Sequence, residues 1–259
     1  MSDAPPIRPA HYPSLDGCVV FVTGGGSGIG AATVEAFARQ GARVAFVDIL
    51  TDISEALVER LSEAQHRPAF LPCDVTNIEA LRGAIEQVRS DVGPIDVLIN
   101  NAARDDRHDV DSVTPEYWDD AMAVNLRHQF FAAQAVRHQM RERGGGSIVN
   151  FSSIAWMAGG VPFVAYATAK AGIVGLTNSL AREFGADNIR VNAIAPGAVV
   201  TERQLRLWYT EEQADETANR QSIRRRLLPD ELARTALFLA ADDSRMITKQ
   251  CIIVDAGLR

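Results

Sequence analysis

The chain has 259 residues, of which 47% are hydrophobic and 23% charged, and its formal net charge is -7. This composition is typical of an ordinary globular protein and excludes the disordered and fibrous classes. The acidic balance argues against a nucleic-acid partner, because proteins that bind DNA or RNA usually present a basic surface.

Membrane and secretory signals are not evident in the sequence. No apolar stretch approaches membrane-spanning length, and the proline-rich opening, MSDAPPIRPAHYPSLDG, lacks the apolar core of a signal peptide. We therefore expect a cytoplasmic protein without a membrane partner. Cys18, Cys73 and Cys251 lie far apart without metal-ligand or redox spacing, so we expect reduced thiols in the core and no metal site.

Short apolar, β-branched runs alternate with helix-like segments along the chain. After an N-terminal arm, residues 1–13, the first run leads into a glycine cluster and a helix over 29–40. The predicted strands are residues 18–23, 43–48, 69–74, 95–100, 147–152, 190–195 and 251–255. Near-continuous apolar strands separated by amphipathic helices predict an α/β fold, a doubly wound parallel seven-stranded sheet with helices on both faces.

Residues 201–228 interrupt this alternation. The stretch TERQLRLWYTEEQADETANRQSIRRRLL is charged and helical in character, and it precedes a helix expected near 229–241. Long excursions beyond the strand ends of such sheets often form lids. No second core or repeat is evident, so we expect one domain over 14–259, with 201–228 as a small helical substrate lid.

A glycine cluster, TGGGSGIG, follows the first strand and opens the first helix. Residues without a side chain let the backbone approach a pyrophosphate, whose negative charge is then stabilised at the helix N-terminus. A tight turn without a ligand would use similar residues. In this strand-turn-helix context, however, the cluster predicts a dinucleotide site at Gly24, Ser27, Gly28, Ile29 and Gly30.

Asp48 ends the second predicted strand, where its carboxylate can accept hydrogen bonds from the adenosine ribose hydroxyls. A 2′-phosphate would place a second negative charge against it, and the glycine cluster contains no lysine or arginine to compensate. We therefore expect NAD rather than NADP. Asp74 ends the third strand and the run NNAA ends the fourth, which places both at the same sheet edge.

Tyr166 and Lys170 lie in AYATAKAGIVGL, an alanine-rich segment with high helix propensity. Side chains at this spacing share one face of a helix. A phenol with a pKa of about 10 is a poor base at neutral pH, but a nearby ammonium favours the phenolate and lowers that pKa. The pair therefore predicts a tyrosine that takes or gives a hydroxyl proton while a hydride moves.

The motifs TGGGSGIG, NNAA, VNL, NFSS, YATAK and, after IRVNAIA, Pro196-Gly197 together resemble the short-chain dehydrogenase/reductase family from end to end. The resemblance implies a Rossmann fold. It implies that Tyr166 is the acid/base and that Lys170 lowers its pKa and holds the nicotinamide ribose. It further implies that Ser153 orients the substrate oxygen and that Asn125 holds a water that relays protons. The implied cofactor contacts outside the glycine cluster are Asp48, Ile49, Asp74, Val75, Asn101, Ala102, Ala103, Tyr166, Lys170, Pro196 and Val199.

Two positions depart from the family pattern. Ala103 and Ala256 stand where glycine is commoner. Neither carries a reacting group, so we expect slightly altered packing and retained activity. Family members are usually tetramers joined through the helices after Asn125 and around Tyr166, so the resemblance implies a homotetramer.

The segments HYPSLDG, NNAARDDRH, YWDDAMAVNLRHQFF, NFSSIAW, RQLRLWYT and IVDAGLR are similar to those of bacterial aldose 1-dehydrogenases, which oxidise D-xylose or L-arabinose to the lactone. The run RDDRH would place donors and acceptors beside the active site, as a hydroxyl-rich substrate requires. Its charges could instead face solvent, and the tryptophans could lie in the core or in a subunit contact. The expected substrate contacts are Asp106, His108, Ser153, Trp156, Tyr166, Arg203 and Trp208.

Two other functions stay open. A ketone or 3-oxoacyl-thioester reductase of the same family would more naturally use NADPH, which Asp48 disfavours. An NAD-binding regulator without chemistry would be expected to lack the tyrosine or the lysine, and both are present. The sequence therefore favours NAD-dependent oxidation of an aldose at C1.

Overall fold

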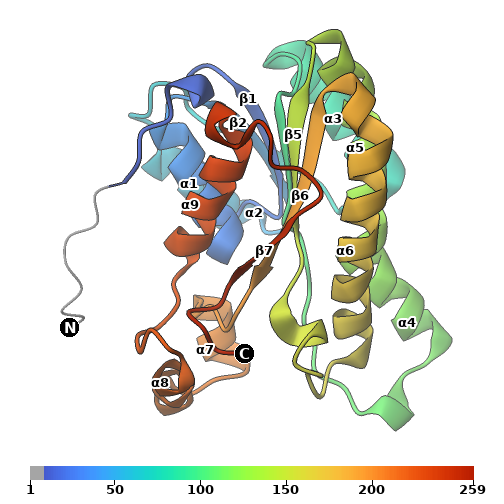
Figure 1. Ribbon diagram of the computed structural model, residues 1–259, viewed down its shortest axis with the longest axis vertical. Helices are drawn as coiled ribbons and strands as arrows, with labels where there is room; N and C mark the ends of the chain where they lie inside the picture. Colours follow the sequence, from blue (N-terminus) through green and yellow to red (C-terminus); the bar gives the residue numbers. More distant parts are fainter. Residues whose placement is uncertain (1–8) are drawn as a thin grey trace.

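The computed structural model describes residues 9–259, in which seven parallel strands form one sheet (Figure 1). The strand order β3-β2-β1-β4-β5-β6-β7 reverses direction between β1 and β4 at the centre. The strands are β1 (Val19–Thr23), β2 (Arg43–Asp48), β3 (Ala69–Pro72), β4 (Val97–Asn100), β5 (Gly146–Phe151), β6 (Ile189–Pro196) and β7 (Cys251–Val254). The predicted doubly wound parallel sheet is confirmed.

Helices cover both faces of the sheet. One face carries α1 (Gly28–Arg39), α2 (Thr51–Arg60) and α9 (Pro229–Ala240), and the other carries α3 (Ile78–Asp91), α5 (His128–Glu142) and α6 (Val164–Phe184). The remaining α-helices are α4 (Pro115–Met122), α7 (Glu202–Leu207) and α8 (Glu211–Arg220). Short 3-10 helices occupy Pro13–Leu15, Val110–Ser112, Ile154–Trp156, Gly185–Asp187 and Asp242–Ser244, and a π-helical turn, Ala123–Arg127, joins α4 to α5. No helix within residues 9–259 is long and apolar enough to cross a membrane.

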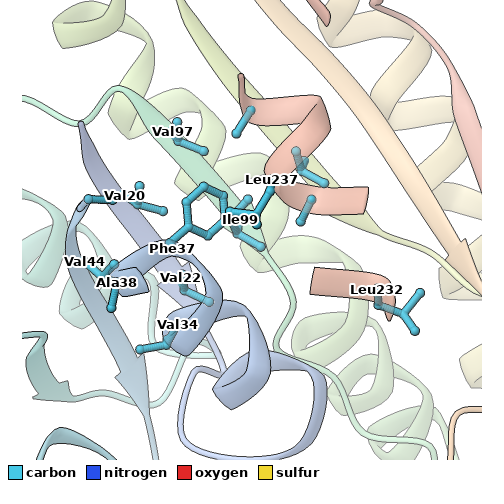
Figure 2. Packing of buried hydrophobic residues seen from close by; sticks show 14 of the residues in the cluster. Val20, Val22, Val34, Phe37, Ala38, Val44, Val97, Ile99, Leu232 and Leu237 are labelled. Carbon is cyan, nitrogen blue, oxygen red and sulfur yellow. The ribbon is translucent and has the colours of Figure 1, made fainter. Parts of the chain in front are cut away.

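The sheet is buried on both sides because its strands send alternate side chains into two hydrophobic layers. Val20 and Val22 of β1 pack with Phe37 of α1 and Leu237 of α9 (Figure 2). Phe21 belongs to the second layer, which α3, α5 and α6 complete. Burial on both faces explains why these strands appear in the sequence as continuous apolar runs.

The predicted strand boundaries agree with the structure within two residues. The largest differences are in β3, which ends at Pro72, and β4, which begins at Val97. β3 stops where its neighbour stops, because Pro72 pairs with Asp48, the last residue of β2. The end of β3 is therefore set by the end of its pairing with β2. The sequence of β3 alone does not show where that pairing ends.

Residues 201–228 fold into two short helices, α7 and α8, where the sequence predicted a charged helical excursion. Each begins at a threonine whose hydroxyl accepts a backbone N–H, Thr201 for α7 and Thr210 for α8. In Figure 1 both lie at the lower end of the sheet, where β6 ends. Residues 1–8 of the predicted arm lie outside the described residues, and Tyr12 at its other end donates its backbone N–H to Gln40.

The two departures from the glycine pattern behave differently. Ala103 is exposed. Ala256 has a φ of 55°, in the left-handed region that costs a residue with a Cβ roughly 1–2 kcal/mol. The departure from glycine therefore strains the backbone at Ala256, whereas the expected effect on packing at Ala103 stays a prediction.

Of the three thiols expected in the core, Cys73 is buried, whereas Cys18 and Cys251 are partly exposed.

A pair of glycine substitutions tests whether close packing fixes the turn after β1. A Cβ on Gly30 would lie 1.8 Å from the carbonyl oxygen of Gly24, so Gly30→Ala should lower the free energy of unfolding by roughly 2 kcal/mol or more. A Cβ on Gly83, exposed in α3, would meet no atom within 4 Å, so Gly83→Ala should raise it by about 0.5–1 kcal/mol. Urea unfolding measures both, and similar values for the two variants would contradict the packing argument.

Candidate active site

The glycine cluster forms a tight turn between β1 and α1. Gly24 and Gly28 have φ values of 66° and 52°, which glycine adopts without strain. A Cβ on Gly24 would lie 2.7 Å from the Cα of Ala102, so the turn packs directly against the end of β4. The turn's own packing therefore requires glycine at these positions. Evidence for a ligand site comes instead from the backbone N–H groups that the turn leaves unpaired.

The N-terminus of α1 supplies such groups. The first N–H groups of a helix have no partner within the helix, and together they favour an anion. Ser27, the N-cap residue, makes no side-chain capping hydrogen bond and is exposed, while Gly28 and Ile29 are partly exposed. Donors at the open end of a twelve-residue helix fit the pyrophosphate of a dinucleotide.

Asp48 ends β2 beside this turn and is 8% exposed. Its carboxylate accepts hydrogen bonds from the backbone N–H groups of Gly26 at 2.8 Å and Leu50 at 3.0 Å. These bonds fix a negative charge at the strand end, and a carboxylate with about four acceptor positions keeps others available. Ile49 is largely exposed next to it.

The ends of β3 and β4 lie at the same edge. The carboxylate of Asp74 accepts hydrogen bonds from the backbone and hydroxyl of Thr76, at 2.9 and 2.8 Å, and Val75 between them is buried. Asn101 follows β4 and donates its side-chain amide to the carbonyl of Gly24 at 2.8 Å. Ala102 is buried against the glycine turn.

β6 completes the edge. Pro196 is its last residue, and Gly197 donates its backbone N–H to Val254 of β7 at 2.9 Å. Val199 is buried and forms an isolated bridge with Leu227, which connects the segment before α7 to the segment before α9. The predicted cofactor residues thus lie at one edge of the sheet, formed by the carboxyl ends of successive strands.

The predicted catalytic residues come from three elements that meet at this edge. Tyr166 and Lys170 lie one turn apart on α6, with the Lys170 Nζ 5.4 Å from the centre of the Tyr166 ring. Lys170 is 1% exposed and donates to the carbonyl of Phe151 at 2.8 Å. Ser153 follows β5, and its hydroxyl accepts the backbone N–H of Ala155 at 3.1 Å.

Asn125 lies in the π-helical turn between α4 and α5. Its side chain accepts the backbone N–H of Arg104 at 2.9 Å and donates to the carbonyl of Ala121 at 3.0 Å. Single π-turns inside helices occur frequently at functional sites. Asn125 is therefore bonded to the loop after β4. The other three predicted catalytic residues, Tyr166, Lys170 and Ser153, lie closer to one another than to Asn125.

The electrostatics of Tyr166 differ from the sequence expectation that Lys170 lowers its pKa. Burial raises the pKa of Tyr166 above its usual value of 10, the charge of Asp105 raises it further, and the Ser153 hydroxyl opposes both effects. Burial also lowers the pKa of Lys170 to about 7. In this site the loss of solvent around the phenol outweighs the interactions that favour its phenolate, so the pKa of Tyr166 is raised overall, and the contribution of Lys170 stays a prediction.

A buried histidine behind the site was not predicted. His128, at the start of α5, is fully buried, and its Nε2 lies 3.1 Å from the carbonyl oxygen of Ala102. Burial and the nearby charge of Lys170 lower the pKa of His128 to about 3, so it is neutral at physiological pH. Nothing in the run NLRHQFF distinguishes this histidine from a surface residue of a helix.

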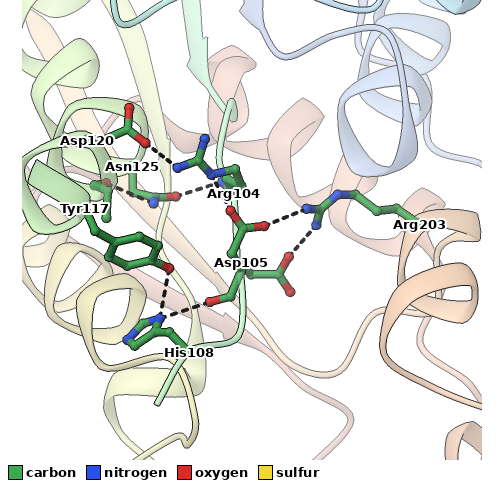
Figure 3. Close-up of polar contacts among 9 residues, drawn as sticks. Arg104, Asp105, His108, Tyr117, Asp120, Asn125 and Arg203 are labelled. Atoms are coloured by element: carbon green, nitrogen blue, oxygen red, sulfur yellow. Dashed lines mark hydrogen bonds and ion pairs between the residues drawn. The ribbon is translucent and has the colours of Figure 1, made fainter. Parts of the chain in front are cut away.

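The loop RDDRH, residues 104–108, is tied to helices on both of its sides (Figure 3). Arg203 of α7 pairs with Asp105 and, at 3.3 Å, with Asp106. Arg104 pairs with Asp120 of α4. These charges are paired within the fold and also partly exposed, so their predicted role beside the substrate stays a prediction.

His108 and Trp208 lie in this cluster with buried nitrogens that have no partner among residues 9–259. Tyr117 of α4 lies 2.9 Å from the His108 Nδ1, and the buried Nε2 is unpaired. The Trp208 Nε1, which can only donate, is also buried and unpaired. Buried polar atoms without partners are costly, so both are candidates for bonding to a ligand.

Arg107 connects this cluster to Tyr166. Its guanidinium lies 4.3 Å from the centre of the Phe163 ring and 5.3 Å from that of Trp208. The Phe163 ring packs edge-on against Tyr166, with 5.8 Å between ring centres. Sequence patterns gave no role to Arg107 or Phe163, because nothing in the sequence shows which side chain of a charged loop turns inward.

Trp156 is less clearly part of the site. It ends the short helix after Ser153 and is 36% exposed, so its predicted contact with a sugar stays a prediction. Within residues 9–259, no three histidine, cysteine, aspartate or glutamate side chains are grouped closely enough to hold a metal ion.

Comparison with known proteins places this geometry in a family. A family model described as enoyl-(acyl carrier protein) reductase matches residues 24–259. A probable galactose dehydrogenase of Rhizobium meliloti is 54% identical over 96% of this chain and 98% of its own length. The D-xylose 1-dehydrogenase of Caulobacter vibrioides is 47% identical over 96% and 99%.

A solved structure is also similar to this chain over nearly its whole length. The crystal structure of a blue fluorescent protein from a metagenomic library, in complex with NADPH, superimposes with a TM-score of 0.87 at 33% identity, over 95% of this chain and 99% of that one. Since relatives match nearly the whole chain and its seven-stranded sheet, the protein belongs to the short-chain dehydrogenase/reductase family and is an oxidoreductase that uses a nicotinamide cofactor.

Proposed function

We propose that this protein oxidises an aldose at C1 to the lactone, with NAD as the hydride acceptor. The observation that carries the proposal is the pair of buried, unpaired nitrogens of His108 and Trp208, in the loop and helix that Arg107 and Phe163 connect to Tyr166. Substrate hydroxyls would supply the missing hydrogen bonds. The names of the two relatives, a galactose and a D-xylose dehydrogenase, support the same substrate class.

The walls of the site favour a polar substrate. The loop 104–108 and the start of α7 bring Asp105, Asp106 and Arg203 together, each partly exposed. An apolar chain placed against such groups would remove their water without replacing its hydrogen bonds. A sugar replaces them, which disfavours an acyl-thioester or aromatic ketone as substrate.

Asp48 supports NAD over NADP. Its carboxylate is held in place by two backbone N–H groups, so it cannot easily turn away from a ligand at the end of β2. The ribose 2′-hydroxyl would donate to it, whereas a 2′-phosphate would be repelled. The structural neighbour that holds NADPH demonstrates what this fold can accommodate and does not decide the preference of this chain.

The cofactor would be held along the strand ends described above. Its pyrophosphate would lie at the N-terminus of α1, with Ser27, Gly28 and Ile29, and its adenosine beside Asp48, Ile49, Asp74 and Val75. Asn101 to Ala103, Pro196 and Val199 would line the nicotinamide half. The nicotinamide ring, when bound, accepts the hydride from C1.

Side chains of the protein would transfer the proton of the C1 hydroxyl. Ser153 would orient the C1 oxygen, and ionised Tyr166 would take the hydroxyl proton as the hydride leaves C1. Lys170 would hold the nicotinamide ribose and favour the phenolate. Asn125 would hold a water that carries the proton onward. Because burial raises the pKa of Tyr166, the phenol is protonated at neutral pH, so oxidation should become faster at alkaline pH.

Two further features complete the proposal. We propose that residues 201–228 close over the substrate, since Arg203 and Gln204 of α7 already reach the loop after β4.

We also propose a homotetramer. Phe130 on α5 and Val164 on α6 are large apolar side chains with 39% and 41% of their surface exposed, on the helices through which the family usually assembles.

A panel of pentoses and hexoses, each assayed with NAD and with NADP, tests the proposed reaction. We expect NADH formation with at least one aldose, and a kcat/KM at least about tenfold higher with NAD because of the Asp48 carboxylate. No turnover of any aldose, together with reduction of an acyl or aromatic ketone by NADPH, would support the reductase alternative.

Tyr166→Phe separates chemistry from cofactor binding. Removing the hydroxyl should lower kcat by roughly 10²- to 10⁴-fold, because the group that takes the hydroxyl proton is lost. NADH binding, followed by its fluorescence, should change little. Full turnover in this variant would contradict the assigned role of Tyr166, and a protein that binds NADH without turning over any substrate would support the regulator alternative.

Lys170 should make stability depend on pH. Its pKa is about 7 in the folded chain, whereas an unfolded lysine titrates near 10.4, so between these values the unfolded state binds the extra proton. The free energy of unfolding should therefore rise by up to about 1 kcal/mol per pH unit from about pH 7 to about pH 9.

Lys170→Met should remove this rise. Lys249→Met is the matched control, because Lys249 is the other lysine of the chain and is exposed. Urea unfolding across that pH range gives the slopes. Equal slopes for the wild type and Lys170→Met would show that the buried ammonium does not lose its proton as described.

A further inference from the structure

Asp105 is held by two donors from α7. One carboxylate oxygen pairs with the guanidinium of Arg203, and the other accepts the side-chain amide of Gln204 at 2.7 Å. The Asp105 side chain is 18% exposed, against 36% for that of Asp106. Asp106 also has two partners, Arg104 and Arg203, so what distinguishes Asp105 is its deeper burial. The sequence predicted Asp106, and not Asp105, as a substrate contact.

Asp105 is also the acidic group that acts on both catalytic side chains of α6. Its charge raises the pKa of Tyr166, and it opposes the lowering of the pKa of Lys170 by burial. Arg107 and Arg203 act on Tyr166 in the opposite sense. The loop that carries Asp105 also reaches Tyr166 by direct packing, because Arg107 lies over the Phe163 ring and that ring packs edge-on against Tyr166.

The carboxylate keeps acceptor positions free. An ionised carboxylate has about four, and the two donors of α7 occupy one on each oxygen. The same loop and helix carry His108 and Trp208, whose buried nitrogens have no partner among residues 9–259. Acceptors and unpaired nitrogens in one cluster match a ligand with several hydroxyls, because each hydroxyl both donates and accepts.

We propose that Asp105 determines substrate specificity by accepting a hydrogen bond from a sugar hydroxyl other than the one being oxidised, and that Arg203 and Gln204 position its carboxylate for this bond. The inference rests on the proposed oxidation of an aldose. It adds the residue that distinguishes sugars by a hydrogen bond to a hydroxyl that is not oxidised. Losing a hydrogen bond to a charged, partly buried acceptor lowers kcat/KM by about 10- to 100-fold.

A purely structural role makes a different prediction. If Asp105 only anchored α7 through Arg203, its removal would slow the oxidation of every sugar by the same factor. If it accepts a substrate hydroxyl, the analogue lacking that hydroxyl has nothing to lose when the carboxylate is removed. A series of monodeoxy analogues of the best aldose substrate separates the two roles.

The experiment compares kcat/KM of the wild type and Asp105→Ala on the parent sugar and on each monodeoxy analogue. The wild type should lose about 10- to 100-fold on one analogue, and Asp105→Ala should show a similar loss on the parent sugar but little further loss on that analogue. The loss should appear mainly in KM. Asp105→Glu, which keeps the charge, should recover part of it.

Controls separate misfolding from specificity. Asp111→Asn changes an exposed carboxylate shortly after the loop and should leave every value unchanged. NADH fluorescence titration should give each Asp105 variant an affinity close to that of the wild type. If Asp105→Ala fails to bind NADH, Asp105→Asn takes its place.

Three outcomes would overturn the inference. One is an equal loss on the parent sugar and on all analogues, another is an Asp105→Ala variant as active as the wild type, and the third is loss of NADH binding in all three Asp105 variants. Failure of the proposed function appears separately, as a wild-type protein that oxidises no aldose of the panel.

Discussion

The position of Tyr166, the proposed acid/base, depends on how Lys170 is buried against the end of β5. Its ammonium donates to the carbonyl of Phe151 at 2.8 Å, and its own carbonyl accepts the hydroxyl of Ser152 at 2.7 Å. These two bonds fix α6 on the sheet, so Tyr166, one turn earlier, is held beside Ser153 at the strand ends. The cost of this arrangement is a desolvated cation, and burial lowers its pKa to about 7.

The proposed selectivity depends on less regular elements. The loop after β4 and the first turn of α7 are far apart in the chain, yet the pairing of Arg203 with Asp105 joins them (Figure 3). In the proposed mechanism, α6 and the end of β5 supply the groups for proton transfer, while the loop after β4 and α7 contact the substrate. Such a division lets one fold act on different substrates, because the loops can vary without moving the tyrosine.

Sequence reasoning succeeded where a residue's environment is set by local pattern. Apolar runs identified every strand, and the TGGGSGIG and YATAK motifs lie where their context placed them. It failed where the environment is set by distant segments. Asp105, Arg107 and His128 acquire their surroundings from α7, Phe163 and Lys170, and burial raises the pKa of Tyr166. Burial and long-range pairing are properties of the folded chain, and no window of sequence contains them.

The path of the hydrogen from C1 tests the central claim most directly. The wild-type protein would be incubated with NAD and an aldose that carries deuterium at C1, and both products would be analysed by mass spectrometry. If the chain holds the sugar so that C1 gives up its hydride while Tyr166 takes the hydroxyl proton, the deuterium will be found in the reduced nicotinamide and the lactone will carry none. Deuterium retained in the sugar product, or released into water, would contradict this account.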